Sequence, residues 1–554
     1  MQDCSTGQIL FHSANAAAVI NDAISNLTSG GKILIKAGTY TFTTATIGSS
    51  PNFAAIGTTT VANIELYGEG NATVLTEGSN LNAAAVIGVN GPSGWYIHDL
   101  QINGARSQQS ASGATGWGLD GIWVSGNDET IEHCYVHDDK TFGIVVGGGS
   151  NEQILYNWVL NNNANGIQLN PPSEGSVIQG NIVNGASDVG ISISGGTTPI
   201  SSVLCYGNTV ENVNLGVSPF GLNTGMDILA GDNGVATSIT VSMNQVYGGK
   251  VGIDSAPFGG TNLGILISDN AVHSTTSNAI MGSATNGLSI SGNLIDISSG
   301  YSVQVYSSDA DVAISGNQIY GNIADFIDTN TAANVLISGN QLEGTGAYIS
   351  GASVQFVDNT VTGAGVALNA GTSNSLVTGN YIYTNPSNYQ LGLYVDGPLT
   401  TVSNNRIVSY SGIYIDSGAT YLSVQGNDFR GCSQIFGGIQ TQTGLIFLNN
   451  KGYNPRGKIV SPFVSSSDTI LDSGSAATLV NATTMTVWES PKIITVITGN
   501  YTSAYTLVIQ IDGTQVLSIT NPAANSVYSF QLQPGETFYC QYHTSQTTFV
   551  VSGE

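Results

Sequence analysis

The sequence predicts an all-β fold: a right-handed parallel β-helix with an N-terminal helical cap and a small C-terminal β-sandwich. Three observations predict it, namely a repeat about one coil long, a glycine marker within each repeat, and loss of the repeat near the C-terminus. The repeat reads apolar, any, any, Asn, any, apolar, as in residues 314–319. Its asparagine recurs at intervals mostly between 21 and 27 residues, which indicates a solenoid. The positions are 157, 181, 208, 244, 270, 293, 317, 340, 359, 380, 405, 427 and 450.

The second marker is a glycine followed by a β-branched residue, eight or nine residues after several repeat positions. It occurs at Gly143, Gly166, Gly190, Gly216 and Gly252. Each period therefore holds short strands separated by turns at Gly and Asn, where φ is positive. One coil cannot bury its own apolar face. Coils stacked at about 4.8 Å bury a continuous apolar column and bring each repeat asparagine onto the next.

The segment before the coils predicts a helical cap. In residues 15–27, Ala17, Ile20 and Ile24 fall on one helical face, and the segment GGKILIKAGTYTF follows. A helix laid over the end of a solenoid covers its unpaired strands. This opening, together with the coils, resembles the pectate-lyase-like superfamily of β-helix lyases, hydrolases, epimerases and tailspikes over roughly residues 12–460. The resemblance implies the fold and leaves the reaction open.

The period is lost after Asn450. The Ser-rich segment SPFVSSSDTILDSGSAA is typical of a linker, and the alternating runs that follow it predict a β-sandwich. We expect three parts: residues 1–94 as the cap and first coils, 95–462 as the β-helix, and 463–554 as the C-terminal module.

Composition excludes several classes of partner. The chain has 11 Lys and Arg against 36 Asp and Glu, a net charge of −25, and only 8% of its residues are charged. A nucleic-acid binder needs a cationic surface, which 11 basic residues cannot form. The sequence contains no run of 18 apolar residues, so we expect no membrane insertion. A surface of Ser, Thr, Asn and Gly is typical of a secreted or cell-surface protein. The five cysteines are far apart and do not predict a disulfide framework.

Two long spacings predict loops that wall a cleft, one from Leu100 to Cys134 and one from Asn208 to Asn244. The first is the richer in reactive groups, because residues 95–158 hold four of the five Trp and three of the six His. Sugar rings pack on aromatic faces, and their hydroxyls bind charged side chains. We therefore expect a groove floored by Trp123, Tyr135 and Trp158 and walled by Trp117 and Arg106, in which these residues and Lys140 bind a polysaccharide substrate. Asp120 is expected to be a solvent-facing turn residue beside this groove.

Glycoside hydrolysis is the favoured reaction. It needs two carboxyls about 5 to 9.5 Å apart, and Asp120 with Asp138 or Asp139 comes from consecutive coils. His137 is a further catalytic candidate, and no metal or cofactor is required. Residues 120–122 are similar to an element of polygalacturonases, although the aspartate pair is displaced and the family's histidine is replaced by asparagine. If this pair fails, the second insertion, with Asp227 and Asp232, is the next place to look.

Two other functions stay open. A uronate lyase or epimerase would use His137, Lys140, Arg106 and Tyr135, with Ca²⁺ as a cofactor; TIEHCYVHDD resembles a coil of mannuronan epimerases but lacks their Asp-Pro-His element. A non-catalytic surface fibre, tailspike or adhesin is the third reading. In that reading Tyr135 and Trp158 are cross-strand packing, and Asp138 and Asp139 are turn residues. A homotrimer is the expected assembly for a solenoid with a C-terminal tip.

Overall fold

The chain divides into two compact units, Met1–Gly300 and Tyr301–Glu554, in the computed structural model, and each is described by itself. Up to residue 450, the structure describes Gln2 and all residues from 6 onward except a set of short stretches. Beyond residue 450 it describes strands only. The excluded stretches are 9, 46–53, 111–118, 214–222, 232–233, 256, 258, 284, 298, 307–309, 322–324, 330–331, 345, 352, 369–371, 387–389, 417, 433, 439–445 and 449.

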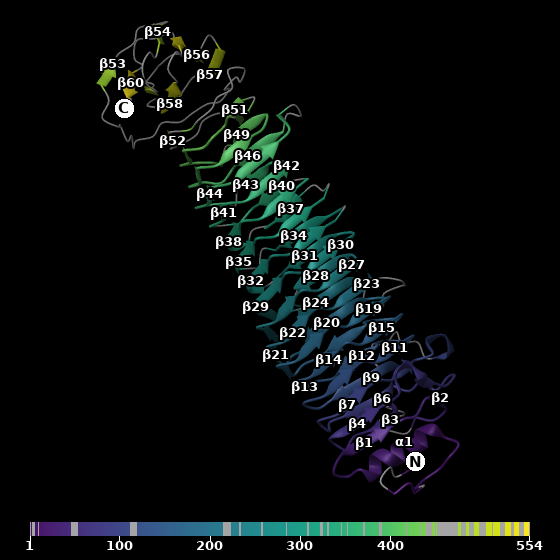
Figure 1. Cartoon of the computed structure of the whole chain (residues 1–554). Helices are drawn as coiled ribbons and strands as arrows, with labels where there is room; N and C mark the ends of the chain where they lie inside the picture. Colours follow the sequence, from purple (N-terminus) through teal and green to yellow (C-terminus); the bar gives the residue numbers. More distant parts are fainter. Residues whose placement is uncertain are drawn as a thin grey trace. The chain divides into compact units, whose positions relative to one another are not determined.

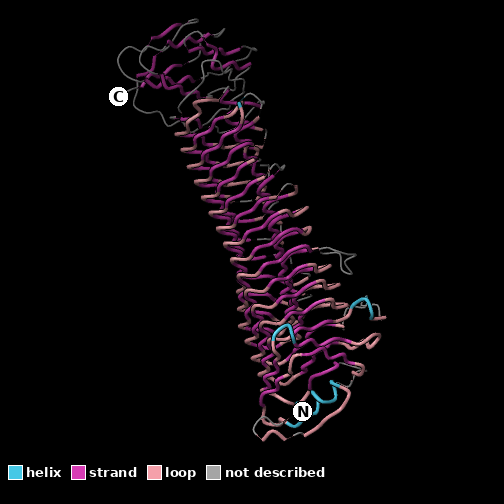
Figure 2. Tube along the Cα trace, turned by 45° about the vertical axis from the view of Figure 1, so that its right-hand side comes forward, coloured by secondary structure: helices cyan, strands magenta, loops and turns pink. Residues whose placement is uncertain are grey.

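The first unit begins with helix α1 (Ala16–Asn26), which confirms the predicted cap (Figure 2). Asn15 caps it, since its side chain accepts a hydrogen bond from the Ala18 amide at 3.3 Å. The apolar face is buried. The Asn21 side chain binds the backbone of strand β3 (Ala54–Thr58), donating to the Ala55 carbonyl at 3.1 Å and accepting from the Gly57 amide at 3.0 Å. The helix therefore covers the backbone at the end of the coils, as a cap must.

The coils of the first unit form three parallel sheets, which we call sheets I, II and III (Figure 1). Sheet I contains β1 (Gly31–Leu34), β4 (Ile64–Tyr67), β7 (Tyr96–His98), β10 (Thr130–Glu132), β14 (Gln153–Leu155), β18 (Val177–Gln179), β22 (Leu204–Tyr206), β26 (Thr240–Ser242), β29 (Thr261–Ser268) and β32 (Thr285–Ser291), with the short strands β13 (Gly149–Ser150), β17 (Ser173–Glu174), β21 (Ile200–Ser201) and β25 (Val235–Thr237).

Sheets II and III complete each coil. Sheet II contains β2 (Gly38–Phe42), β5 (Thr73–Glu77), β8 (Gln101–Asn103), β11 (Tyr135–His137), β15 (Trp158–Leu160), β19 (Ile182–Asn184), β23 (Thr209–Val213), β27 (Gln245–Gly248), β30 (Ala271–His273) and β33 (Leu294–Asp296). Sheet III contains β3, β6 (Ala85–Asn90), β9 (Asp120–Ser125), β12 (Ile144–Val146), β16 (Ile167–Leu169), β20 (Val189–Gly195), β24 (Thr224–Ala230), β28 (Val251–Ser255) and β31 (Asn278–Gly282).

The second unit repeats the three-sheet pattern and then changes to antiparallel pairing. Its coils comprise β34 (Tyr301–Val305), β35 (Ala310–Ser315), β36 (Gln318–Tyr320), β37 (Asp325–Asp328), β38 (Ala333–Ser338), β39 (Gln341–Glu343), β40 (Gly346–Ile349), β41 (Gln355–Val357), β42 (Thr360–Gly363), β43 (Val366–Leu368), β44 (Leu376–Thr378), β45 (Tyr381–Thr384), β46 (Leu391–Val395), β47 (Thr401–Ser403), β48 (Arg406–Val408), β49 (Ser411–Ile415), β50 (Ser423–Gln425), β51 (Gln434–Gly438) and β52 (Ile446–Leu448). The predicted parallel β-helix is confirmed in both units.

The C-terminal strands form two antiparallel four-stranded sheets, in keeping with the predicted all-β module. One contains β53 (Ser475–Ala477), β60 (Thr548–Ser552), β55 (Lys492–Ile497) and β58 (Val527–Leu532); the other contains β54 (Thr483–Thr486), β59 (Thr537–Gln541), β56 (Thr506–Ile511) and β57 (Thr514–Thr520). Most of the Ser-rich segment lies outside the described residues, and the expected boundaries near 94 and 462 stay predictions.

The repeat asparagines form a hydrogen-bonded ladder within each unit, as predicted. Asn181 shows the pattern: its backbone amide and its Nδ2 both donate to Asn208 Oδ1, at 2.9 and 3.0 Å. Its Nδ2 also donates to the Ile154 carbonyl at 2.8 Å, and its Oδ1 accepts from Asn157 at 2.8 and 3.0 Å. The side chain is buried. Each ladder asparagine therefore satisfies turn groups that no strand can reach.

Replacing Asn181 by Leu is expected to lower the free energy of unfolding by about 1 to 3 kcal/mol, because buried amide and carbonyl groups lose their partners. Chaotrope unfolding followed by circular dichroism measures this. Asn71→Leu is the control, since Asn71 is exposed. Equal free energies of unfolding for the two variants would contradict a stabilising role of the ladder.

The cysteines that the structure describes are core residues. Cys134, Cys205 and Cys432 are buried free thiols, and burial raises the pKa of Cys134 and Cys205 to about 12. They fill inward positions and are unreactive there. Among the helices of the described chain, none has the length and apolar character to cross a membrane.

Candidate active site

Two of the expected binding rings lie together on sheet II. Tyr135 and Trp158 are register partners on β11 and β15, with ring centroids 6.3 Å apart in an edge-on arrangement. The Trp158 side chain is 54% exposed. The alternation of the sequence predicted this outward pair correctly, and it forms an aromatic surface open to solvent.

His137 is engaged at both ring nitrogens. Its Nδ1 lies 2.8 Å from Asp138 Oδ2, and Gln101 Nε2 donates to its Nε2 at 2.9 Å. Arg106 lies beside this pair, because its amide donates to the Asp138 carbonyl at 2.8 Å and its Nη1 to the Asn161 carbonyl at 3.0 Å. The expected histidine, aspartate and arginine are thus brought together. Both ring nitrogens of His137 therefore have a polar partner within the chain.

The same histidine–aspartate arrangement occurs on another sheet. His98 Nδ1 lies 2.8 Å from Asp99 Oδ2 at the end of β7, in a Tyr-x-His-Asp sequence like that of residues 135–138. In both copies the aspartate has a positive φ. The pair is therefore a local strand-end motif, and its presence at His137 does not by itself indicate catalysis. Lys140 is half-buried two residues beyond the second copy.

The other expected ring lies elsewhere. Trp123 is on sheet III, where it packs against Phe142, Val145 and Ala164. Trp117 lies outside the described residues. The expected groove floored by Trp123 together with Tyr135 and Trp158 does not form, because the rings belong to different sheets.

The expected carboxyl pair is not at the surface. Asp120 and Asp139 are buried, whereas Asp138 is about half exposed. Asp120 Oδ1 accepts hydrogen bonds from Thr141 Oγ1 and from the Phe142 amide, the latter at 3.3 Å, and burial raises its pKa to about 7. Burial, with the nearby Asp120 carboxyl, raises the pKa of Asp139 well above its usual range. The expectation that Asp120 is a solvent-facing turn residue is wrong, because the next coil covers it.

A different column of polar side chains lies on the outer face of sheet III. Gln168, Ser192, Asp227 and Asp254 are successive register partners on β16, β20, β24 and β28. In each of these strands the residues on either side of the column position, such as Ile191 and Met226, belong to the core. Because side chains alternate along a strand, the column faces away from the core.

The two aspartates of this column are coupled. Asp227 is 2% exposed and Asp254 is 7% exposed. Burial, together with the Asp188 carboxyl, raises the pKa of Asp227 to about 7, although Ser192 opposes the shift. Burial and then the Asp227 charge raise the pKa of Asp254 well above its usual range. Because the Asp227 charge opposes ionisation of Asp254, Asp227 ionises first and Asp254 is still an acid when its neighbour is charged.

Sequence reasoning named Asp227 as the second choice and missed Asp254. Two signals were available. Gly225-Met226-Asp227 and Gly252-Ile253-Asp254 share the pattern Gly, apolar residue, Asp, and 27 residues, one repeat length, separate the two aspartates. Asp232 and insertion residues 214–222 lie outside the described residues.

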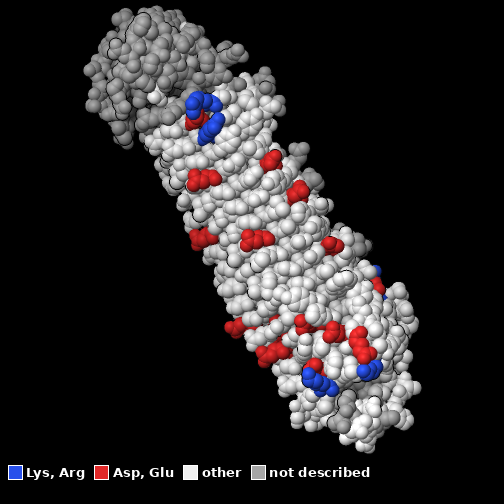
Figure 3. All heavy atoms as spheres, viewed as in Figure 1, with Lys and Arg blue, Asp and Glu red and all other residues white. Residues whose placement is uncertain are grey.

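Charged side chains cover a small part of the face drawn in Figure 3, most of which is uncharged. Within the described part of the chain, no cluster of three or more His, Cys, Asp or Glu side chains is arranged to hold a metal ion. The sheet III column itself offers carboxyl, amide and hydroxyl groups.

Three of the solved structures to which the chain is similar are the following. The tailspike of E. coli bacteriophage HK620, solved in complex with a hexasaccharide, has 13% identity and a TM-score of 0.46, covering 100% of this chain and 92% of its own. The mannuronan C-5 epimerase A-module of Azotobacter vinelandii has 16% identity and a TM-score of 0.34, covering 81% and 99%. The α-1,3-glucanase catalytic unit of Streptomyces thermodiastaticus has 16% identity and a TM-score of 0.35, covering 72% and 67%.

Identities and TM-scores this low carry no argument about the reaction, and no curated protein sequence matches the chain. The family model described as a right-handed beta helix region matches residues 7–254 and 303–454. These ranges comprise most of the chain and include the helical cap and most of the coils described above. The chain therefore belongs to the right-handed β-helix family.

Proposed function

We propose that the chain is a glycoside hydrolase that cleaves a polysaccharide, with Asp227 and Asp254 as its catalytic carboxyls. One observation carries the proposal: the two aspartates are register partners on adjacent parallel strands, on the outer face of sheet III. The strand spacing of about 4.8 Å is close to the carboxyl separation of about 5 to 5.5 Å used by retaining hydrolases.

The electrostatic interaction between Asp227 and Asp254 assigns their catalytic roles. Asp254 keeps its proton, because burial and the neighbouring charge both oppose its ionisation. It is the general acid that protonates the glycosidic oxygen. Asp227 ionises first, near pH 7, and attacks the anomeric carbon. Gln168 and Ser192, next in the column, supply amide and hydroxyl groups for sugar hydroxyls.

Burial sets a condition for this chemistry. Asp227 is 2% exposed and Asp254 is 7% exposed, so both side chains must become accessible when the glycan binds. The low-dielectric surroundings that raise both pKa values also strengthen charge interactions with an oxocarbenium-like transition state.

A uronate lyase is the second candidate, and two observations place it behind the hydrolase. His137 has hydrogen-bond partners at Nδ1 and Nε2. The net charge of −25 also repels a polyuronate. A non-catalytic fibre is the third candidate. Secretion to the cell exterior, where polysaccharides accumulate, is part of our proposal, and a homotrimer stays a prediction for sedimentation to test.

One experiment separates the three candidates: the purified full chain is incubated with a panel of neutral and uronate polysaccharides. We expect new reducing ends without ultraviolet absorbance from unsaturated uronates. His137→Ala combined with Lys140→Ala should leave this release nearly unchanged. Absorbance from a new double bond, lost in that double variant, would instead establish a lyase, and no product from any polysaccharide would favour the fibre.

A further inference from the structure

We propose a second, non-catalytic glycan-binding surface at the turn between sheets I and II. It consists of His133, Tyr135, Tyr156 and Trp158, and we call it the ring ridge. It belongs to the coils of β10, β11, β14 and β15, and it shares no residue with the sheet III aspartates. The inference does not depend on hydrolysis, because it concerns binding alone.

The rings stand in two pairs that follow successive coils. The His133 and Tyr156 rings are stacked, with centroids 5.7 Å apart and planes 20° apart. The Tyr135 and Trp158 rings form the edge-on pair described above. Tyr156 is 43% exposed, and the His133 side chain is 56% exposed. Four neighbouring rings therefore face solvent on either side of the buried ladder residues Cys134 and Asn157.

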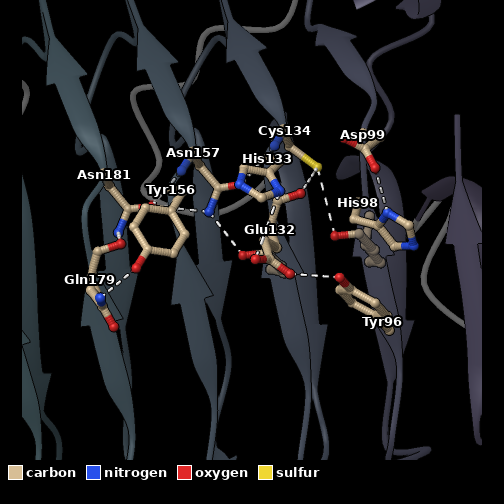
Figure 4. A network of polar contacts seen from close by, with 12 residues as sticks. Tyr96, His98, Asp99, Glu132, His133, Cys134, Tyr156, Asn157, Gln179 and Asn181 are labelled. Atoms are coloured by element: carbon tan, nitrogen blue, oxygen red, sulfur yellow. Dashed lines mark hydrogen bonds and ion pairs between the residues drawn. The ribbon is translucent and has the colours of Figure 1, made fainter. Parts of the chain in front are cut away.

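Polar contacts position the Tyr156 and His133 rings before any ligand arrives (Figure 4). The Gln179 side chain donates to the Tyr156 hydroxyl at 2.6 Å and accepts from the Tyr206 hydroxyl. The Glu132 carboxylate lies 3.7 Å from His133 Nδ1 and accepts from the Tyr96 hydroxyl at 2.6 Å. Rigid rings lose little conformational entropy on binding, which favours affinity.

The backbone position of His133 and Tyr156 is the strongest evidence. Both residues directly precede a ladder position and have positive φ values, 50° and 53°. At this place the later coils have Gly, Asp or Asn, with Met243 as the exception: Gly180, Gly207, Asp269, Gly292, Gly316, Gly339, Asp358, Gly379, Asn404 and Gly426. Glycine, Asp and Asn adopt this conformation with little strain, whereas a ring does not.

Packing does not compensate for that strain, because the two rings remain exposed. Residual backbone strain of this kind is typical of functional positions. The next coil also makes room for the ring: a Cβ at Gly180 would lie 2.4 Å from Tyr156 Cδ1. The bulky side chains are therefore best explained by a ligand that they contact.

The chemistry of the ridge favours an uncharged glycan. Aromatic faces pack on the C–H patches of sugar rings, and the Glu132 carboxylate and Gln179 amide beside them suit sugar hydroxyls. An anionic ligand such as a nucleic acid or a polyuronate would meet Glu132 and a chain of net charge −25.

The test is affinity electrophoresis of the full chain in gels containing a neutral β-glucan, a galactomannan or polygalacturonate. We expect retardation by a neutral glycan and none by polygalacturonate. Tyr156→Gly and Trp158→Ala should each weaken binding roughly tenfold or more. Met243→Gly makes the matched backbone change at the same turn position outside the ridge, and it should bind as the wild type does.

Stability separates a binding role from a structural one. Tyr156→Gly relieves a positive φ, so its melting temperature should equal or exceed that of the wild type while binding is lost. A clear fall in melting temperature, unchanged binding, or retardation by polygalacturonate alone would overturn the proposal. Wild-type chain that no neutral glycan retards would overturn it too. Asp254→Asn should bind normally, so failure of the hydrolase proposal would leave this result unaffected.

Discussion

The free energy of unfolding is expected to fall steadily as pH rises from about 4 to about 9. The cause is a set of seven buried carboxyls whose pKa is raised in the folded chain: Glu77, Asp120, Glu129, Asp139, Glu152, Asp227 and Asp254. Burial is the largest cause for each of them. Burial raises the pKa of Asp120 to about 7, that of Glu129 to about 8 and that of Glu152 to about 9.

The direction in which the free energy of unfolding changes with pH follows from proton binding. Below about pH 4 these groups are protonated in both states and folding is not penalised. Between that pH and their folded pKa values the folded state holds protons that the unfolded state has released. Each group then lowers the free energy of unfolding by about 1.4 kcal/mol per pH unit. Glu65, Glu69 and Asp428 have lowered pKa values and act in the opposite direction, but their ion-pair partners are exposed and the effect is small.

Thermal unfolding followed by circular dichroism at pH 3.5, 5, 7 and 9 measures this slope. Glu152→Gln should raise the melting temperature at pH 7 and leave it unchanged at pH 3.5. At pH 7 the unfolded chain has released the Glu152 proton whereas the folded chain still holds it, and glutamine removes this cost of folding. Glu174→Gln is the control, since Glu174 is exposed. A melting temperature that rises from pH 4 to pH 7 would contradict the account.

Much of the fold was predictable because the same type of residue, asparagine, fills the same buried turn in successive coils. A buried turn needs a side chain with both a donor and an acceptor, and the recurrence of asparagine at one coil length reveals where such side chains stack. The hydrogen bonds from Asn181 to Asn208 confirm this predicted stacking of asparagines.

The candidate site was harder to predict, for a geometric reason. Alternation tells whether a side chain points in or out, but a coil has three outward faces. Trp123 and Tyr135 both point outward, yet they lie on sheets III and II. Cover by a neighbouring coil is also invisible in the sequence, so Asp120 was expected at the surface, whereas Thr141 and Phe142 of the next coil bind it. Asp254 could be recognised as a candidate only by searching for aspartates separated by one repeat length, as Asp227 and Asp254 are.

Loss of either sheet III carboxyl should abolish hydrolysis. Asp254→Asn removes the proton donor and Asp227→Asn the nucleophile, and we expect each to lower turnover by several orders of magnitude. Both variants should fold, because a neutral amide replaces a group that is costly to ionise where it lies. Turnover of the wild type should rise as pH passes about 7, where Asp227 ionises while Asp254 keeps its proton.

Asp296→Asn provides the control for this pair, since Asp296 is an exposed aspartate on sheet II whose side chain is 65% accessible. Its turnover should equal that of the wild type. A pH profile that falls through neutrality in the folded chain would show that some other group supplies the nucleophile.

The most direct test of the central claim is the rate of reducing-end release at pH 7 by the wild type, Asp227→Asn, Asp254→Asn and Asp120→Asn, on the polysaccharide the wild type cleaves best. We expect the two sheet III variants to be inactive, whereas Asp120→Asn, altered at the buried start of β9, cleaves at a rate near that of the wild type. Full activity of Asp227→Asn or Asp254→Asn, with loss of activity in folded Asp120→Asn, would contradict it and return the active site to the first insertion.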